Sequence, residues 1–175
     1  MNEKKDFIHL LQEEGIRFEV GNPNLLSTSS HYMEQVDERS VAIFYELFEE
    51  DEDIQIMIHD YHKRKTRSTG VIKKFIKNKK IKYTSKVRKV NGIESYFEIN
   101  IRCRVNEIRI KQLLHHIASK DIIGTPNSDL DYFIIGVTNK QIYHLYDDRG
   151  LDIFLPSESR RADIKTKYQS WVLSE

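Results

Sequence analysis

The stretch IESYFEINIRCRV, residues 93–105, indicates the fold of this chain more clearly than any other. Every odd position except Ser95 is apolar or cysteine, and the even positions carry Glu, Tyr, Asn and Arg side chains. Alternation with a period of two predicts a β-strand with one face against a core and the other in water. The rest of the chain is therefore interpreted around a sheet.

The segment before this strand, residues 81–90, also alternates and is joined to it by the turn signal Asn91-Gly92. A two-residue loop would place the apolar faces of the two segments on opposite sides of the hairpin. A three-residue register aligns them, and its pairs are Val87 with Phe97, Tyr83 with Ile101, and Ile81 with Cys103. Because a one-residue shift turns every side chain to the other face, we predict an odd loop or a β-bulge here.

The other elements follow from their apolar spacing. Helices are predicted near residues 4–14, from residues 27–30 to about 50, shortly after Thr69, and around residues 110–117. A last helix after Pro156 is expected to turn Ile164, Tyr168, Trp171 and Val172 toward the core. Strands are predicted at residues 16–20, 54–61, 132–138, 141–147 and 151–155, the second of them central in the sheet.

This order of elements, αβαβαββαβββα, predicts one α+β domain over residues 1–175. We expect a mainly antiparallel mixed sheet with helices packed on it, and a C-terminal three-stranded meander followed by a helix.

Composition excludes several classes of protein. Hydrophobic residues make up 39% and charged residues 31% of the chain, which is typical of a folded, soluble domain. A single cysteine, Cys103, excludes an internal disulfide and a cysteine-built zinc site. The chain has no apolar run of about 18 residues, and its N-terminal segment does not fit a secretory signal peptide. These features predict a cytoplasmic protein.

Charge is segregated along the chain although the net charge is only +1. Residues 1–60 contain 15 acidic and 4 basic side chains, whereas residues 61–93 contain 13 basic and no acidic ones. One interpretation is that the two stretches lie together and neutralise each other, with little gain per exposed pair. The other is that each stretch presents a field to a partner of opposite charge.

The residues that would carry such a partner interaction form two sets. The acidic set, at the unfavourable C-terminal end of the long helix, is Glu46, Glu49, Glu50, Asp51, Glu52 and Asp53. The basic set is Lys73, Lys74, Lys77, Lys80, Lys82, Lys86 and Arg88, within the basic 63–89 segment.

Catalytic and cofactor signatures are absent from the sequence, which has no P-loop, dinucleotide fingerprint, nucleophile elbow or metalloprotease motif. We therefore assign no catalytic residue, no metal and no cofactor. Cys103 lies on the apolar face of its strand, where a packed thiol is expected. Asp60 and His62 would share one side of a strand and could both face a metal ion, but no third ligand is identifiable.

The segment YDDRGLD, residues 146–152, combines carboxylates with a guanidinium. Asp147, Asp148, Arg149, Gly150 and Asp152 fit a tight turn that Arg149 fixes by binding Asp147 or Asp152. A divalent-cation site at this tip is the alternative interpretation.

The ending IYHLYDDRGLDIF, followed by KYQSWVL, resembles an uncharacterised bacterial family of domains of unknown function. Its members end with a similar YDDRG-D segment and a K-Y-x-x-W stretch. The resemblance extends from Arg17 to Leu173 and excludes the central portion from Lys63 to Arg88. It implies a loose association with toxin and immunity gene neighbourhoods, and no transferable activity.

Three functions are compatible with these observations. The leading hypothesis is a non-enzymatic immunity- or antitoxin-like protein that binds a partner, such as a toxin, through a charged surface. The alternative is a nucleic-acid-binding module that uses the basic segment. A metal-dependent hydrolase is third, built on Asp60 and His62 or on Asp147, Asp148 and Asp152.

Overall fold

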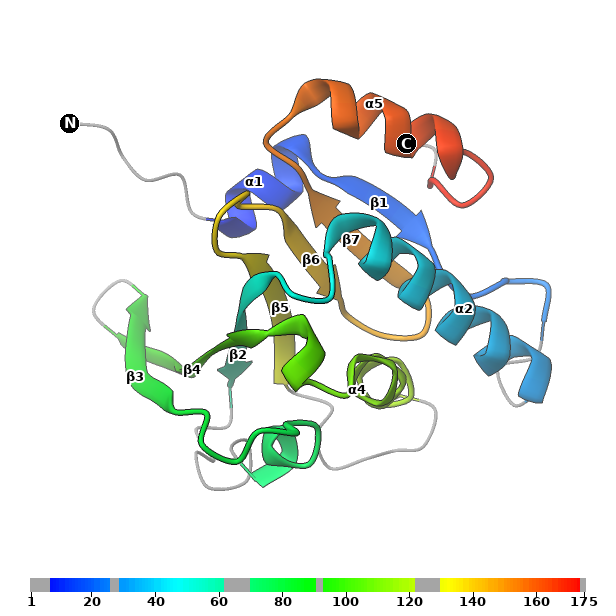
Figure 1. Ribbon diagram of the computed structural model, residues 1–175. Helices are drawn as coiled ribbons and strands as arrows, with labels where there is room; N and C mark the ends of the chain where they lie inside the picture. The colour runs from blue at the N-terminus through cyan, green and yellow to red at the C-terminus, as the bar shows by residue number, and fades with distance from the viewer. Residues whose placement is uncertain (1–6, 26–28, 62–69, 91–92, 122–129, 174–175) are drawn as a thin grey trace.

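The fold of the protein is a seven-stranded sheet with helices on both faces (Figure 1). The computed structural model describes residues 7–25, 29–61, 70–90, 93–121 and 130–173. The strands are β1 Ile16–Glu19, β2 Asp53–Asp60, β3 Tyr83–Val90, β4 Ile93–Arg104, β5 Leu130–Gly136, β6 Ile142–Leu145 and β7 Gly150–Phe154. The helices are α1 Phe7–Glu14, α2 Ser30–Leu47, α4 Ile110–Ala118 and α5 Glu158–Lys167, with the 3₁₀ turn η1 Val105–Glu107.

The strands lie in the order β1-β7-β6-β5-β2-β4-β3, and every adjacent pair is antiparallel. The predicted α+β class, the meander β5–β6–β7 followed by a helix, and the internal position of β2 are confirmed. The word "mixed" is too broad, because no parallel pair occurs among the described strands.

The β3–β4 hairpin contains the irregularity that its apolar pattern requires. Val87 pairs with Phe97 and Tyr83 with Ile101, as predicted for aligned apolar faces. The register shifts between Arg88 and Lys89, so that Val90 pairs with Ile93 across a two-residue connection. A bulge therefore reconciles the short turn with the alternation of the strands.

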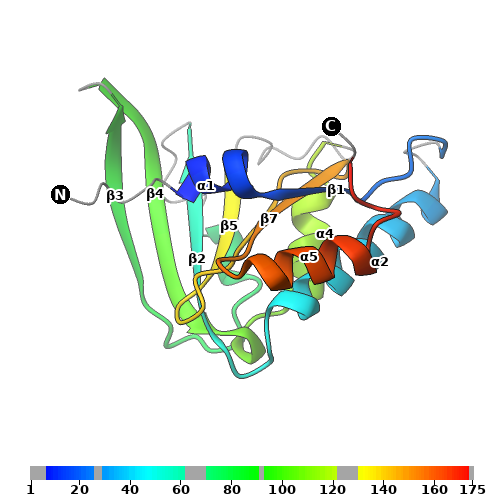
Figure 2. The same ribbon diagram turned by 90° about the horizontal axis from the view of Figure 1, so that it is seen from above.

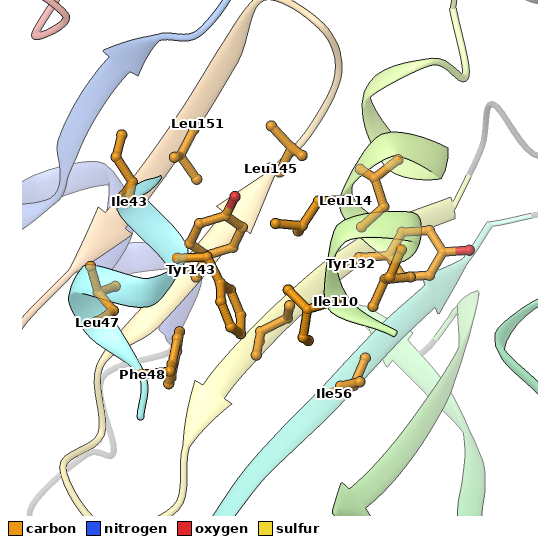
Figure 3. Close-up of a cluster of buried hydrophobic side chains, with 14 of the residues drawn as sticks. Ile43, Leu47, Phe48, Ile56, Ile110, Leu114, Tyr132, Tyr143, Leu145 and Leu151 are labelled. Atoms are coloured by element: carbon orange, nitrogen blue, oxygen red, sulfur yellow. The ribbon is translucent and has the colours of Figure 1, made fainter. Parts of the chain in front are cut away.

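Two cores lie on opposite faces of the sheet. α2 and α4 cover one face and form the larger core with it. In this core the Tyr143 ring packs against side chains of α2 (Figure 3). The Tyr143 hydroxyl, buried there, donates to the backbone carbonyl of Ser40 at 2.9 Å, so its burial leaves no unsatisfied group. α1 lies on the other face and packs on a smaller cluster around Met57 and Phe133 (Figure 2). Neither helix layer extends over β3, which lies at the far edge of the sheet (Figure 2).

The C-terminal segment differs from its prediction. α5 begins after the N-cap Ser157 and ends at Lys167, so Trp171 and Val172 lie beyond the helix. The chain then runs beside β1: the backbone N–H of Glu19 donates to the Trp171 carbonyl, and Val172 pairs with Phe18. The unpaired edge of β1 recruits these residues because its backbone groups need partners. Trp171 and Val172 still pack against the main core.

Some predictions concern residues outside the described ranges. The basic loop after Tyr61, with His62 and Thr69, is among these. No helix that the structure describes combines the length and apolar character needed to cross a membrane.

Candidate functional site

The acidic set surrounds a pocket where α2 passes into β2. α2 ends at Leu47, three residues earlier than predicted, because Phe48 is extended. The pocket has a volume of about 510 Å³. Its acidic lining residues are Glu46, Glu49, Asp51, Glu52 and Asp53, and Tyr45, Asn139 and Arg160 lie beside them. Glu50 is exposed next to the pocket.

The acidic residues form their contacts with α5 and with neighbouring strands. Glu46 accepts from the Lys167 ammonium at 2.5 Å and from the Tyr168 hydroxyl at 3.1 Å. The hydrogen bond from Lys167 holds the pKa of Glu46 below its usual value. Asp53 lies 3.8 Å from the guanidinium of Arg104. Among the described residues, no ion pair joins residues 46–53 to the basic set.

A buried amide that the sequence analysis missed fixes the geometry of this loop. The Gln141 side chain, fully buried, donates to the Leu47 carbonyl at 3.0 Å and to a carboxylate oxygen of Glu52 at 2.7 Å. The backbone of η1 also binds the loop, since Val105 N–H donates to the Glu52 carbonyl and Asn106 N–H to that of Glu50. The acidic loop is thus held from two sides. Only the three-dimensional pairing of β5 and β6 brings Gln141 to this place.

The structure divides the basic set into two groups. Lys73, Lys74, Lys77 and Lys80 precede β3; Lys77 donates to the Asn106 carbonyl, and Lys73 lies over the Tyr83 ring. Lys82, Lys86 and Arg88 lie farther along, on the α1 side of the sheet. There they line a groove of about 500 Å³ over β3, β4 and β2, together with Arg102.

A row of ionisable side chains crosses the same face of the sheet and was not predicted. Lys86, Glu98, His59 and Asp131 are cross-strand neighbours on β3, β4, β2 and β5. Glu98 is buried; burial alone raises its pKa, but hydrogen bonds from Arg88, Asn100 and Lys86 outweigh this and hold the pKa below its usual value. Each of these residues occurs on a different segment, so only the strand register reveals the row.

The row continues toward β1. His144 stacks on Phe133 with ring centroids 4.2 Å apart, and it is the cross-strand neighbour of Asp152. Asp152 in turn binds Arg17 through two hydrogen bonds of 2.9 and 3.0 Å. Burial lowers the pKa of His144 to about 4, so this imidazole is neutral at pH 7.

The YDDRG segment forms a pinned turn between β6 and β7. The Asp147 carboxylate accepts from the backbone N–H groups of Arg149 and Gly150, and it also binds the Arg149 guanidinium. Asp148 accepts from the Tyr32 hydroxyl of α2 at 2.7 Å. Of the two partners predicted for Arg149, the structure selects Asp147, and Arg17 binds Asp152 instead.

The structure groups the candidate metal-binding carboxylates differently from the prediction. Asp147 and Asp148 are joined by Asp121, and one oxygen from each lies within 4.8 Å of the others. Asp152 lies elsewhere, beside Arg17, and Asp60 is buried in β2. Arg149 and Tyr32 already use Asp147 and Asp148, so these contacts explain the turn without an ion.

Cys103 is buried against the main core, as predicted, and burial raises the pKa of its thiol to about 12. Such a thiol carries almost no thiolate at neutral pH, which makes it a poor nucleophile.

Comparison with known proteins gives a family and no activity. A curated relative, "Uncharacterized protein YnaE" of Bacillus subtilis (strain 168), is 28% identical over 155 residues, which cover 78% of this chain and 73% of the relative. No solved structure matches the chain. The family model for a domain of unknown function, DUF3885, matches residues 2–175, which agrees with the resemblance carried by the YDDRG turn and the K-Y-x-x-W stretch. The chain belongs to the DUF3885 family.

Proposed function

We propose that this protein is a non-enzymatic, cytoplasmic interaction protein of the immunity or antitoxin type. Its acidic pocket between α2 and β2 would receive a basic surface of a partner protein, such as a toxin. The proposal places the recognition in the charge and shape of this pocket and requires no chemical step.

The observation that carries the proposal is the excess of negative charge in the pocket. Five carboxylates and one guanidinium line it, which leaves a net charge of −4 in the lining. The C-terminal end of α2 adds its partial negative charge at the same place. The ion pair of Lys167 with Glu46 neutralises part of this negative charge. Glu49 and Asp51 are exposed and have no ion-pair partner among the described residues. A field of this kind favours a cationic surface and speeds its association.

The pocket is also rigid and contains an aromatic anchor. Its loop is held by Gln141 and η1, so docking would cost little ordering entropy. Tyr45 is 43% exposed at its rim, although a large aromatic side chain is usually buried. Tyrosines in such positions are common in the energetically dominant part of protein interfaces.

The test is a titration of the purified protein with the purified products of toxin genes encoded beside its own gene. The double charge reversal Glu49→Lys/Asp51→Lys removes the exposed part of the field. The matched control is Glu34→Lys/Asp163→Lys, which reverses two exposed helical carboxylates outside the pocket. We expect the pocket variant to weaken binding about tenfold or more and the control to leave it unchanged. No binding by any of these products, or equal effects of the two variants, would contradict the proposal.

A further inference from the structure

The groove over β3, β4 and β2 is a second charged site, separate from the acidic pocket. α1 covers the β5–β7 part of this face and Met57, and no described helix lies over β3 (Figure 2). The groove of about 500 Å³ is therefore open along the edge of the sheet. On β2 and β4, the Gln55–Arg102 pair lines the groove, and the Asp53–Arg104 pair comes next along the strands. The Asp53–Arg104 pair therefore marks the boundary between the groove and the acidic pocket.

The groove has an excess of positive charge. Lys82, Lys86, Arg88 and Arg102 line it with one carboxylate, that of Glu98, which gives a net charge of +3. Glu98 is bound by Lys86 at 3.1 Å and by Arg88 at 2.5 Å, so the acid anchors two of the cations. Lys82 and Arg102 are exposed and have no ion-pair partner among the described residues. The remaining field attracts an anion with more than one charge.

The spacing of the cations is that of an extended polyanion. Lys86 and Arg88 of β3, and Lys82 just before the strand, are separated by even numbers of residues and all line the groove. Alternate residues of a strand, such as Lys86 and Arg88, are about 7 Å apart, which is close to the distance between successive phosphates of an extended nucleic-acid strand; Lys82 lies about two such steps from Lys86. Amide side chains on the floor of the groove add hydrogen-bonding groups, with the Gln55 amide donating to Asn100 at 2.7 Å.

An aromatic pair lies at one end of this row. Tyr96 is the cross-strand neighbour of Arg88, and its ring is 4.3 Å from that of His59. Tyr61, 47% exposed, lies with its ring centroid 5.6 Å from that of Tyr96. Tyr61 is thus exposed and Tyr96 half-buried. Aromatic side chains beside cations on an open antiparallel sheet are groups on which unpaired bases stack.

We propose that this face binds single-stranded nucleic acid. The β3 cations and Arg102 would contact the phosphates, and Tyr61 with Tyr96 would stack against a base. A duplex keeps its bases stacked on one another, so it could use the cations alone. An acidic peptide would likewise gain nothing from the tyrosine pair beyond apolar contact.

The test measures fluorescence anisotropy of a labelled 15-nucleotide oligouridylate over a series of salt concentrations. The same series is recorded with a duplex of equal length and with a poly-glutamate peptide. The wild type is compared with Lys82→Ala/Arg102→Ala, with Tyr61→Leu, and with the control Lys111→Ala/Lys165→Ala, which removes two exposed helical cations elsewhere. Thermal melting checks that each variant is folded.

We expect the single strand to bind tighter than the duplex and the peptide. Lys82→Ala/Arg102→Ala should lower the slope of log affinity against log salt by about 1.4. Tyr61→Leu should weaken binding at least about fivefold. The control should change neither quantity.

Three results would overturn the proposal: no binding of the oligonucleotide at low salt, equal affinity for duplex or peptide, or equal losses in the groove and control variants. The acidic pocket plays no part in this experiment. A negative result with the oligonucleotide would therefore leave the proposed docking function untouched. A negative result with the toxins would likewise leave the nucleic-acid proposal untouched.

Discussion

The carboxylate of Glu46 binds the ammonium of Lys167 at 2.5 Å, across 121 residues of sequence. The acidic segment thus forms its ion pairs with α5 and with Arg104, whereas Lys86 and Arg88 of the basic segment bind Glu98 on their own hairpin. Two charge excesses remain at separate places, one in the pocket and one in the groove. This separation is the structural basis of both proposals.

The Tyr32–Asp148 hydrogen bond joins α2 to the YDDRG turn and should contribute measurably to stability. Burial raises the pKa of Tyr32 above its usual value, and the hydrogen bond to Asp148 raises it further, so the hydroxyl stays a donor. Tyr32→Phe leaves the buried Asp148 carboxylate without this donor and should lower the free energy of unfolding by about 1–3 kcal/mol. Tyr45→Phe removes an exposed hydroxyl and is the matched control. Equal urea-unfolding curves for the two variants would contradict this role.

Gly21 lies against the same contact and should tolerate no side chain. A Cβ there would lie 2.2 Å from the Tyr32 hydroxyl and 2.6 Å from the Asp148 carbonyl oxygen. We expect Gly21→Ala to destabilise the protein by about 1–3 kcal/mol, because backbone and a buried ring must move. Gly70→Ala serves as the control, since a Cβ at Gly70 meets nothing within 4 Å. The comparison is made by thermal unfolding, and a neutral Gly21→Ala would show that the turn is not tightly packed.

His144 should make stability depend on pH. Its folded pKa of about 4 lies below the unfolded value, so the unfolded state binds the proton first as pH falls. Stability is then lost progressively from about pH 6.5 down to pH 4. His116, whose pKa is lowered by burial, acts in the same direction, whereas Glu98 and Asp147, with lowered pKa values, act only at lower pH.

The variant His144→Phe isolates this contribution. Phenylalanine keeps the stack on Phe133 and removes the titrating nitrogen. The difference in unfolding free energy between the variant and the wild type should grow in favour of the variant between pH 6.5 and pH 5, by up to about 1.4 kcal/mol per pH unit. Parallel stability profiles over this range would contradict the lowered pKa of His144 in the folded state.

The order of elements was predictable because each strand and helix here carries its own periodic apolar pattern. Residues 81–105 show how far such reasoning extends: the conflict between a two-residue turn and aligned apolar faces predicted the bulge at Arg88. The end of α5 was not predictable in this way. Trp171 and Val172 continue the helical spacing, but the open edge of β1 offers them backbone partners that local pattern cannot reveal.

The acidic pocket was predictable only as composition. Glu46 to Asp53 could be identified as an acidic cluster, but the pocket depends on Gln141 and η1, which approach through tertiary structure. The groove was predictable in part, because the predicted hairpin register already places Arg102 beside the basic strand face, whereas Gln55 and Met57 of β2 join it only through the strand order. The ionisable row with His59 and His144 has no local signal at all.

The most direct measurement of the central claim is the association rate constant with the adjacent-gene toxin as a function of salt. For the wild type, we expect this rate constant to fall steeply between about 0.05 and 0.5 M salt, because the acidic pocket attracts the partner over a distance. Glu49→Lys/Asp51→Lys should lower the rate constant at low salt and flatten its salt dependence. Equal rate constants and equal salt dependence for the two proteins would contradict docking through the acidic pocket.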